Sequence, residues 1–399
     1  MVLLALGAGL LVWQRPWQQS EQAVVGIPAD ATTVLTAQFR ALSEARTEKA
    51  FLAAAGTTAS ARTFAKDAWT ARKALGATQV ELRYVTGGDV ADRVDGSSVA
   101  TVEVTWQPGR ASGLEGASRH SSSVRFRMIP QKGGTFAVVN ARAATGALPI
   151  WLAGKVTVER HAGAAVVRVD GGDAKQPIDA MATTARDEVL EVVPHTAGTL
   201  TVVSPRTQGE MAQLVGQKVA DVRQIAAVTT RLDGGGTSVG AVIVLNPVVF
   251  ATMDRRAEQV VLTHEATHLL TKAVGTRAET WVVEGFADFV ALHADSAPLS
   301  LSAGQVLAEV KAGNGPKHLP TAADFSATKH GLGAVYESAW MIFRMLAERF
   351  GDAKVEKFYA RVLGGTSLER ALSSSFGLSS AQLTSDWRTY LAKSASTVS

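Results

Sequence analysis

His264-Glu265-Ala266-Thr267-His268 lies in a stretch of helical pattern that Asp254 is placed to cap. Two histidines four positions apart differ by about 40° around a helix axis, so their imidazoles reach the same point in space. Zinc binds such nitrogens at about 2.0–2.1 Å. Glu265 flanks that point, where a carboxylate can take a proton from a water that the zinc activates. The pentapeptide therefore predicts a zinc site with His264 and His268 as ligands and Glu265 as general base.

A pair of carboxylates follows in Trp281-Val282-Val283-Glu284-Gly285-Phe286-Ala287-Asp288. Glu284 and Asp288 are four residues apart, so they share one face of a helix whose other residues are mostly apolar. Carboxylates in such surroundings are costly to bury without partners, and a zinc ion and a histidine supply those partners. Glu284 is therefore predicted as the third zinc ligand, which leaves a fourth position open for water. Asp288 is predicted as the carboxylate that orients a ligand imidazole.

With both elements present, residues 195–399 resemble the gluzincin metallopeptidases, the group of thermolysin and aminopeptidase N. The resemblance implies a zinc peptidase with the three ligands and the general base assigned above. The aminopeptidase-like branch also has a tyrosine on a later helix. This feature implies that Tyr336, in Tyr336-Glu337-Ser338-Ala339-Trp340, donates a hydrogen bond to the tetrahedral oxyanion. The chain is similar in this respect to the broad group of peptidase-MA-like proteins.

Two features differ from the type families. Fifteen residues, 269–283, separate His268 from Glu284, fewer than in those families. The strand expected over Ala241–Leu245 stands where gluzincins have the edge strand that pairs with substrate backbone, and aminopeptidases have an acidic residue near it that binds the free amine. No acid occurs in Gly240–Asn246. The choice between an aminopeptidase and an endopeptidase therefore stays open, with a preference for an endopeptidase.

The whole chain predicts an α+β protein. Helical spacing over 35–75 is followed by alternating apolar positions over 101–140. This order predicts helices and an antiparallel sheet, and it resembles the ketosteroid-isomerase-like cone fold. A mixed sheet and then a helical part are expected from Trp151 onward, with capping boxes at Thr366–Glu369 and Ser379–Gln382. The predicted boundaries are 1–17 for an amino-terminal anchor or signal segment, 18–30 for a linker, 31–150 for an accessory domain and 151–399 for the peptidase domain.

Composition limits the function classes. The chain has 399 residues, of which 46% are hydrophobic and 19% charged, enough for two or three packed domains. It has no cysteine, which excludes disulfides, thiolate metal sites, iron–sulfur clusters and a cysteine nucleophile. A metal must therefore be held by His, Asp or Glu. A net charge of +4 without a basic run gives no support for nucleic acid as a partner.

The amino terminus is an uncharged apolar run, MVLLALGAGLLVW over 1–13, which is too short for a membrane span of about 20 residues. No Lys or Arg precedes the run, and no A-x-A cleavage site follows it. Trp13 and Trp17 suit a membrane interface. A single-pass anchor whose start lies upstream is the preferred interpretation. A cleaved signal peptide and an apolar tail packed on the domain are the alternatives.

The sequence thus predicts a membrane-anchored zinc metallopeptidase outside the cytoplasm that acts on a peptide or protein substrate. The alternative from another class is a catalytically silent, zinc-stabilised binding or scaffold protein of the cell envelope. Such a protein needs neither Glu265 nor Tyr336, since neither binds zinc in this scheme. The presence of both favours the enzyme.

Overall fold

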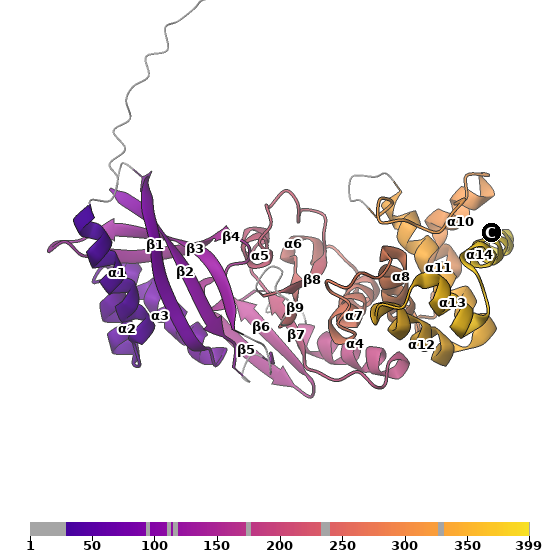
Figure 1. Cartoon of the computed structure of the whole chain (residues 1–399), viewed down its shortest axis with the longest axis horizontal. Helices are drawn as coiled ribbons and strands as arrows, with labels where there is room; N and C mark the ends of the chain where they lie inside the picture. The colour runs from indigo at the N-terminus through magenta and orange to yellow at the C-terminus, as the bar shows by residue number, and fades with distance from the viewer. Residues whose placement is uncertain are drawn as a thin grey trace, which may run out of the picture.

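Three helices and an antiparallel sheet form the amino-terminal part of the protein (Figure 1). The computed structural model describes residues 29–92, 96–109, 113–114, 119–172, 177–232, 240–325 and 331–398. The four-stranded sheet has the order β1-β2-β3-β4, and neighbouring strands run antiparallel, as the alternating pattern predicts. The helices are α1 (Ala29–Glu44), α2 (Glu48–Ala55) and α3 (Ala59–Ala74), and the strands are β1 (Thr78–Asp92), β2 (Ser97–Gln107), β3 (His120–Pro130) and β4 (Phe136–Thr145).

A mixed sheet occupies the middle of the molecule, with strand order β5-β6-β7-β9-β8 (Figure 1). Strands β6, β7 and β9 run parallel to one another, whereas β5 and β8, at the two edges, run antiparallel to their neighbours. The short helix α5 (Gln208–Val215) begins with a capping box formed by Thr207 and Glu210. The strands are β5 (Val156–His161), β6 (Ala164–Val169), β7 (Leu200–Ser204), β8 (Ala227–Arg231) and β9 (Ala241–Leu245), and the 3-10 helix η2 (Ile150–Leu152) precedes them.

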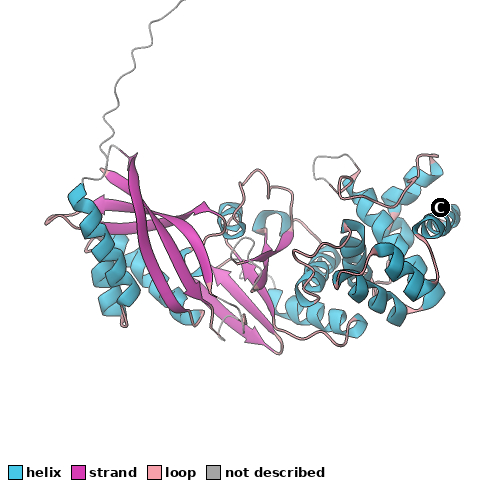
Figure 2. Cartoon of the chain, in the orientation of Figure 1, coloured by secondary structure: helices cyan, strands magenta, loops and turns pink. Residues whose placement is uncertain are grey.

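Helices make up the carboxy-terminal end of the molecule, as expected (Figure 2). The predicted capping box at Ser379–Gln382 is confirmed. The one at Thr366–Glu369 is wrong: Ser367 takes the N-cap position without a side-chain cap hydrogen bond, and the carboxylate of Glu369 accepts the Ser380 N–H instead. Helix α4 (Ile178–Val192) connects β6 to β7, and the short helix α6 (Pro247–Phe250) follows β9. The helices after them are α7 (Arg255–Leu270), α8 (Thr280–Ala291), α9 (Leu299–Ser302), α10 (Gly304–Lys311), α11 (Leu332–Phe350), α12 (Asp352–Leu363), α13 (Leu368–Phe376) and α14 (Ser380–Thr397).

The three central strands of the mixed sheet, β6, β7 and β9, are buried on both faces. Val167, Val203 and Val244 face a hydrophobic cluster that they share with α1–α3, the antiparallel sheet and η2. The residues one position earlier, Val166, Val202 and Ile243, face a second cluster with α4, α7 and the carboxy-terminal helices. Because successive side chains of a strand point to opposite faces, burial on both faces requires strands that are apolar throughout. The first cluster crosses residue 150, the boundary that the sequence predicts between two domains.

The expectation that Ala241–Leu245 is an edge strand of the mixed sheet is wrong, because the two edge strands are β5 and β8. That segment is β9, which lies between β7 and β8. The composition of β9 explains its central place in the sheet. Its sequence, Ala-Val-Ile-Val-Leu, is apolar at every position, as a strand covered on both faces must be. The edge strand β8, Ala-Val-Thr-Thr-Arg, has three polar residues among its five.

The amino-terminal anchor expected at 1–17 and most of the linker expected at 18–30 lie outside the described residues. Within the described part of the chain, none of the helices combines the length and the apolar character that a membrane crossing requires. The location of the protein outside the cytoplasm stays a prediction.

Candidate metal centre

Helix α7 carries the first motif between the mixed sheet and the carboxy-terminal helices. As predicted, Asp254 caps this helix, and its side chain accepts the Ala257 N–H at 2.8 Å. One side of α7 packs on α4 and α8, and another lies against β8 and β9. Ala266 and Leu262 are fully buried, so the helix is fixed in rotation, and His264 and His268 project together from one face.

Three ligand atoms converge beside α7. The Nε2 atoms of His264 and His268 are 2.9 Å apart, and Glu284 Oε2 on α8 lies 3.2 Å from the first and 3.4 Å from the second. Zinc bonds of about 2.1 Å in tetrahedral geometry separate neighbouring ligand atoms by about 3.4 Å. Two imidazole nitrogens and one carboxylate oxygen are also a donor set that zinc prefers. The three predicted ligands therefore fit a zinc ion in both spacing and chemistry.

Asp288, one turn after Glu284, holds His264 from behind. Its Oδ1 lies 2.7 Å from His264 Nδ1, the predicted contact, and this leaves Nε2 facing the other two ligand atoms. His268 has no equivalent support: its Nδ1 is buried and lacks a hydrogen-bond partner among the described residues. The two histidines are thus held unequally, one by a carboxylate and one by packing alone.

The electrostatics of the cluster favour a cation. Burial alone would lower the pKa of His264, but the nearby carboxylates of Asp288 and Glu284 outweigh burial and raise this pKa well above its usual value. Burial acts to raise the pKa of Glu284, yet hydrogen bonds and charge from the two histidines lower it below its usual value. A proton and a metal ion compete for the same imidazole nitrogen, so a field that favours one also favours the other.

Glu265 reaches from α7 to strand β8. Its Oε2 accepts the backbone N–H of Thr229 at 2.7 Å and the Thr229 hydroxyl at 2.6 Å. The hydroxyl also lies 2.9 Å from the backbone oxygen of Glu265. Sequence reasoning did not identify Thr229, because a threonine in a short, half-polar strand carries no signal that separates it from any other.

Tyr336 lies in the first turns of α11, and its ring centroid is 6.2 Å from that of His264. The ring of Phe325 packs edge-on against it, with centroids 5.1 Å apart. Burial raises the pKa of Tyr336, and the carboxylates of Glu284, Asp288 and Glu265 raise it further. The phenol of Tyr336 therefore stays protonated and able to donate a hydrogen bond. None of the described residues forms a hydrogen bond with its hydroxyl.

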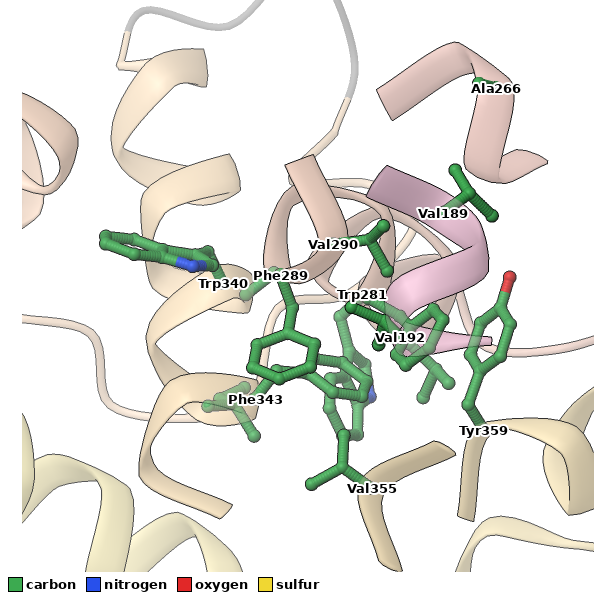
Figure 3. Close-up of a cluster of buried hydrophobic side chains, with 14 of the residues drawn as sticks. Val189, Val192, Ala266, Trp281, Phe289, Val290, Trp340, Phe343, Val355 and Tyr359 are labelled. Atoms are coloured by element: carbon green, nitrogen blue, oxygen red, sulfur yellow. The ribbon is translucent and has the colours of Figure 1, made fainter. Parts of the chain in front are cut away.

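Gly285 brings α11 close to α8. A Cβ atom at this position would lie 2.7 Å from the backbone oxygen of Ala339, so only glycine fits the crossing. Around it, Trp281, Phe289 and Phe343 pack together between the two helices (Figure 3). Because Gly285 follows Glu284 directly, the same close approach sets the distance between the third ligand and the helix of Tyr336.

Gly285→Ala is expected to lower the free energy of unfolding by about 1–3 kcal/mol, since the new methyl group overpacks a helix crossing that cannot relax without moving backbone. Denaturant unfolding of the purified variant measures this loss. Gly304→Ala is the matched control, because a Cβ there meets nothing within 4 Å. Equal effects of the two substitutions would contradict the proposed role of the crossing.

Among the described residues a second group of possible ligands comprises Glu159, His161 and Asp179. Arg168 lies among them, with Nη2 3.4 Å from Glu159 and 3.0 Å from Asp179. The hydrogen bond and charge of Arg168 are the main cause of the lowered pKa of Glu159. A guanidinium already neutralises these carboxylates, so the group is an ion-pair network and does not fit a metal.

Comparisons with known proteins find no sequence relative and only distant structural similarity. No family model matches the sequence, and no curated protein matches it. Among solved structures, a mutant M1 zinc metallopeptidase from Deinococcus radiodurans with a bound Tyr-Ser-Ala substrate is similar at a TM-score of 0.37 and 12% identity. A mutant two-domain M1 zinc metallopeptidase with bound L-arginine gives a TM-score of 0.35 and 12% identity. Each alignment covers 79% of this chain and 61% of the other. These similarities are too low to assign a family.

Proposed function

We propose that the protein is a zinc-dependent hydrolase of peptide bonds. The observation that carries the proposal is the convergence of His264 Nε2, His268 Nε2 and Glu284 Oε2 within 3.4 Å of one another. Their side chains are 11–20% exposed, so the site is largely desolvated but not sealed. The residues proposed to hold the zinc are these three, with Asp288 orienting His264.

The chemistry divides among a few side chains. When bound, zinc supplies a Lewis acid that makes water nucleophilic near neutral pH. Glu265 accepts a proton from the attacking water and returns it to the leaving amine nitrogen as the peptide C–N bond breaks. Tyr336 donates its hydrogen bond to the carbonyl oxygen as negative charge develops there, and its raised pKa keeps the proton on the phenol.

Strand β8 is the proposed binding edge for the substrate backbone, in place of β9. It is an edge strand, and its Thr229 N–H points away from β9 towards Glu265. An extended peptide that pairs with this edge would therefore pass beside the general base. Neither β8 nor β9 contains an acidic residue that could bind a free amine, so the preference for an endopeptidase stays a prediction.

The alternative, a silent zinc-stabilised scaffold, accounts for the ligands but not for their neighbours. Glu265 and Tyr336 bind none of the ligand atoms, yet the ring of Tyr336 lies beside His264, and the charge of Glu265 acts on the phenol together with those of Glu284 and Asp288. A scaffold gains nothing from a carboxylate and a protonated phenol beside its metal.

The proposal is tested by incubating the zinc-loaded protein with an unbiased peptide library and identifying the products by mass spectrometry. Cleavage that a chelator abolishes and that added zinc restores is the expected result. The Glu265→Gln protein, purified in parallel, controls for a contaminating peptidase. Stoichiometric zinc without cleavage of any peptide would favour the scaffold instead.

Tyr336→Phe is expected to reduce kcat by about 100-fold, the usual scale for one oxyanion donor, with zinc content and melting temperature unchanged. The effect falls on kcat more than on KM because the developing oxyanion uses the bond better than the ground-state carbonyl does. The kinetic constants kcat and KM are measured with a peptide substrate from the library, and the zinc content and melting temperature are measured on the same preparation.

Tyr359→Phe is the matched control for this prediction. Tyr359 stacks on Phe286 with ring centroids 3.8 Å apart, and its hydroxyl lies 3.0 Å from Thr271 Oγ1. This substitution should lower the melting temperature and leave turnover by the folded fraction near normal. An unchanged kcat in Tyr336→Phe would remove Tyr336 from the catalytic residues.

A further inference from the structure

Thr229 on strand β8 forms hydrogen bonds with Glu265, the proposed general base. It lies at the centre of β8 with 9% of its surface exposed. Three contacts of 2.6–2.9 Å join it to Glu265: its N–H and its hydroxyl to Oε2, and its hydroxyl to the backbone oxygen. The strand thus fixes the side chain of Glu265 as well as the helix that carries it.

These contacts make the two carboxylate oxygens of Glu265 unequal. Oε2 accepts two hydrogen bonds from Thr229, whereas no described residue donates to Oε1. An oxygen that already accepts two bonds is the poorer place for a further proton, because that proton would have to displace a donor. Oε1 is therefore the oxygen that is free to exchange a proton with water.

The hydroxyl of Thr229 also has two acceptors for one proton. It can donate to Oε2 at 2.6 Å or, after a turn about the Cβ–Oγ1 bond, to the Glu265 backbone oxygen at 2.9 Å. A hydroxyl proton takes whichever acceptor is better. When the carboxylate becomes neutral, the hydroxyl keeps a partner and the backbone N–H still holds Oε2.

From this geometry we infer that Thr229 is a positioning residue that anchors Glu265 through Oε2 and leaves Oε1 as the proton carrier. The inference rests on the proposed function. In the first step a water O–H bond breaks, an Oε1–H bond forms, and the water oxygen bonds to the carbonyl carbon while the C=O π pair moves onto the carbonyl oxygen. In the second, that pair re-forms the C=O bond, the C–N bond breaks, and the proton passes from Oε1 to the leaving nitrogen. Thr229 exchanges no proton in either step and acts only by holding Oε2.

The kinetic test compares threonine substitutions on the two edge strands of the mixed sheet, β8 and β5. Thr229→Val keeps the shape and the backbone N–H but removes the hydroxyl, so kcat should fall by about 10- to 100-fold with KM changed by less than about twofold. Thr229→Ser restores the hydroxyl and should return kcat to within about threefold of the wild type. Thr157→Val is the matched control, because it makes the same chemical change on β5, the opposite edge strand, where the side chain of Thr157 is exposed.

A second test does not depend on activity. The melting temperature of the metal-free protein is measured for Thr229→Val, Glu265→Ala and the double variant. If the hydroxyl anchors Glu265, Thr229→Val lowers the melting temperature by about 3 °C in the wild-type background and by much less in the Glu265→Ala background. An equal loss of melting temperature in both backgrounds would overturn the inference that the Thr229 hydroxyl anchors Glu265.

The outcomes separate this inference from the proposed function. If no peptide is cleaved, the melting cycle still decides whether Thr229 anchors Glu265. If peptides are cleaved and Thr229→Val turns over normally, the positioning role is overturned and the proposed function stands. A loss of kcat that Thr229→Ser fails to restore also overturns it, because the hydroxyl would then not be the group that matters.

Discussion

Glu265→Gln should lower kcat by about three to four orders of magnitude while the protein keeps its zinc, since a general base contributes on this scale and an amide cannot accept the proton. The amide has nearly the shape of the carboxylate, and its oxygen can still accept the N–H of Thr229, so the fold has no reason to change. Single-turnover hydrolysis of a peptide from the library, with metal analysis on the same sample, measures both quantities.

Glu284→Gln is the companion variant, because it makes the same chemical change at a proposed ligand. It should weaken zinc binding itself, as a neutral amide oxygen is a poorer ligand than a carboxylate. Equal loss of zinc from the two variants would mean that the base and the third ligand have been exchanged in the assignment.

Removing either histidine should have the second large effect. His264→Ala or His268→Ala leaves two of three protein ligands, and the zinc content should fall from about one per chain to less than about 0.1 after dialysis. Activity should fall with it. Metal analysis and competition with a chromophoric chelator give the stoichiometry and the affinity.

His293→Ala is the matched control for these variants. His293 follows helix α8, and its Nε2 lies 3.8 Å from Asp352, outside the group of ligand atoms. Its loss should leave zinc binding intact. A wild-type protein that stays metal-free when supplied with zinc would refute the whole site.

The centre was predictable from sequence where its geometry is local. His264 with His268, and Glu284 with Asp288, are pairs four residues apart on a helix, so the helix alone brings each pair together. Both helices form, and their ligand atoms meet. The packing of α7 against α8 is not a local feature of the sequence. A metal that needs three ligands nevertheless limits where α8 can lie relative to α7.

The contacts that the sequence did not predict cross between elements. Thr229 is 36 positions from Glu265, and the strand order that makes β8 the edge depends on how β7 and β9 pair. Gly285 matters only because α11 crosses α8 at that residue. Residue types such as threonine in a strand and glycine in a helix are too common to signal such contacts.

Strand β1 also escaped prediction, although it has 15 residues. Its pairing with β2 shifts register at several points, beginning between Thr78 and Glu81. Each shift moves side chains to the other face and breaks the alternation on which strand prediction depends. Strands β2 and β3 pair with each other without a shift, and their alternation was visible.

The hydrophobic cluster that crosses residue 150 bears on how the protein can be dissected in the laboratory. A fragment of residues 151–399 retains the three proposed metal ligands, the proposed base and Tyr336, and the predicted domain boundary makes it the unit to express. It would nevertheless expose to water the valines at 167, 203 and 244, which the amino-terminal helices and sheet help to cover. A bare apolar sheet face promotes aggregation. The first 150 residues are therefore expected to keep the metal-binding part of the protein from aggregating.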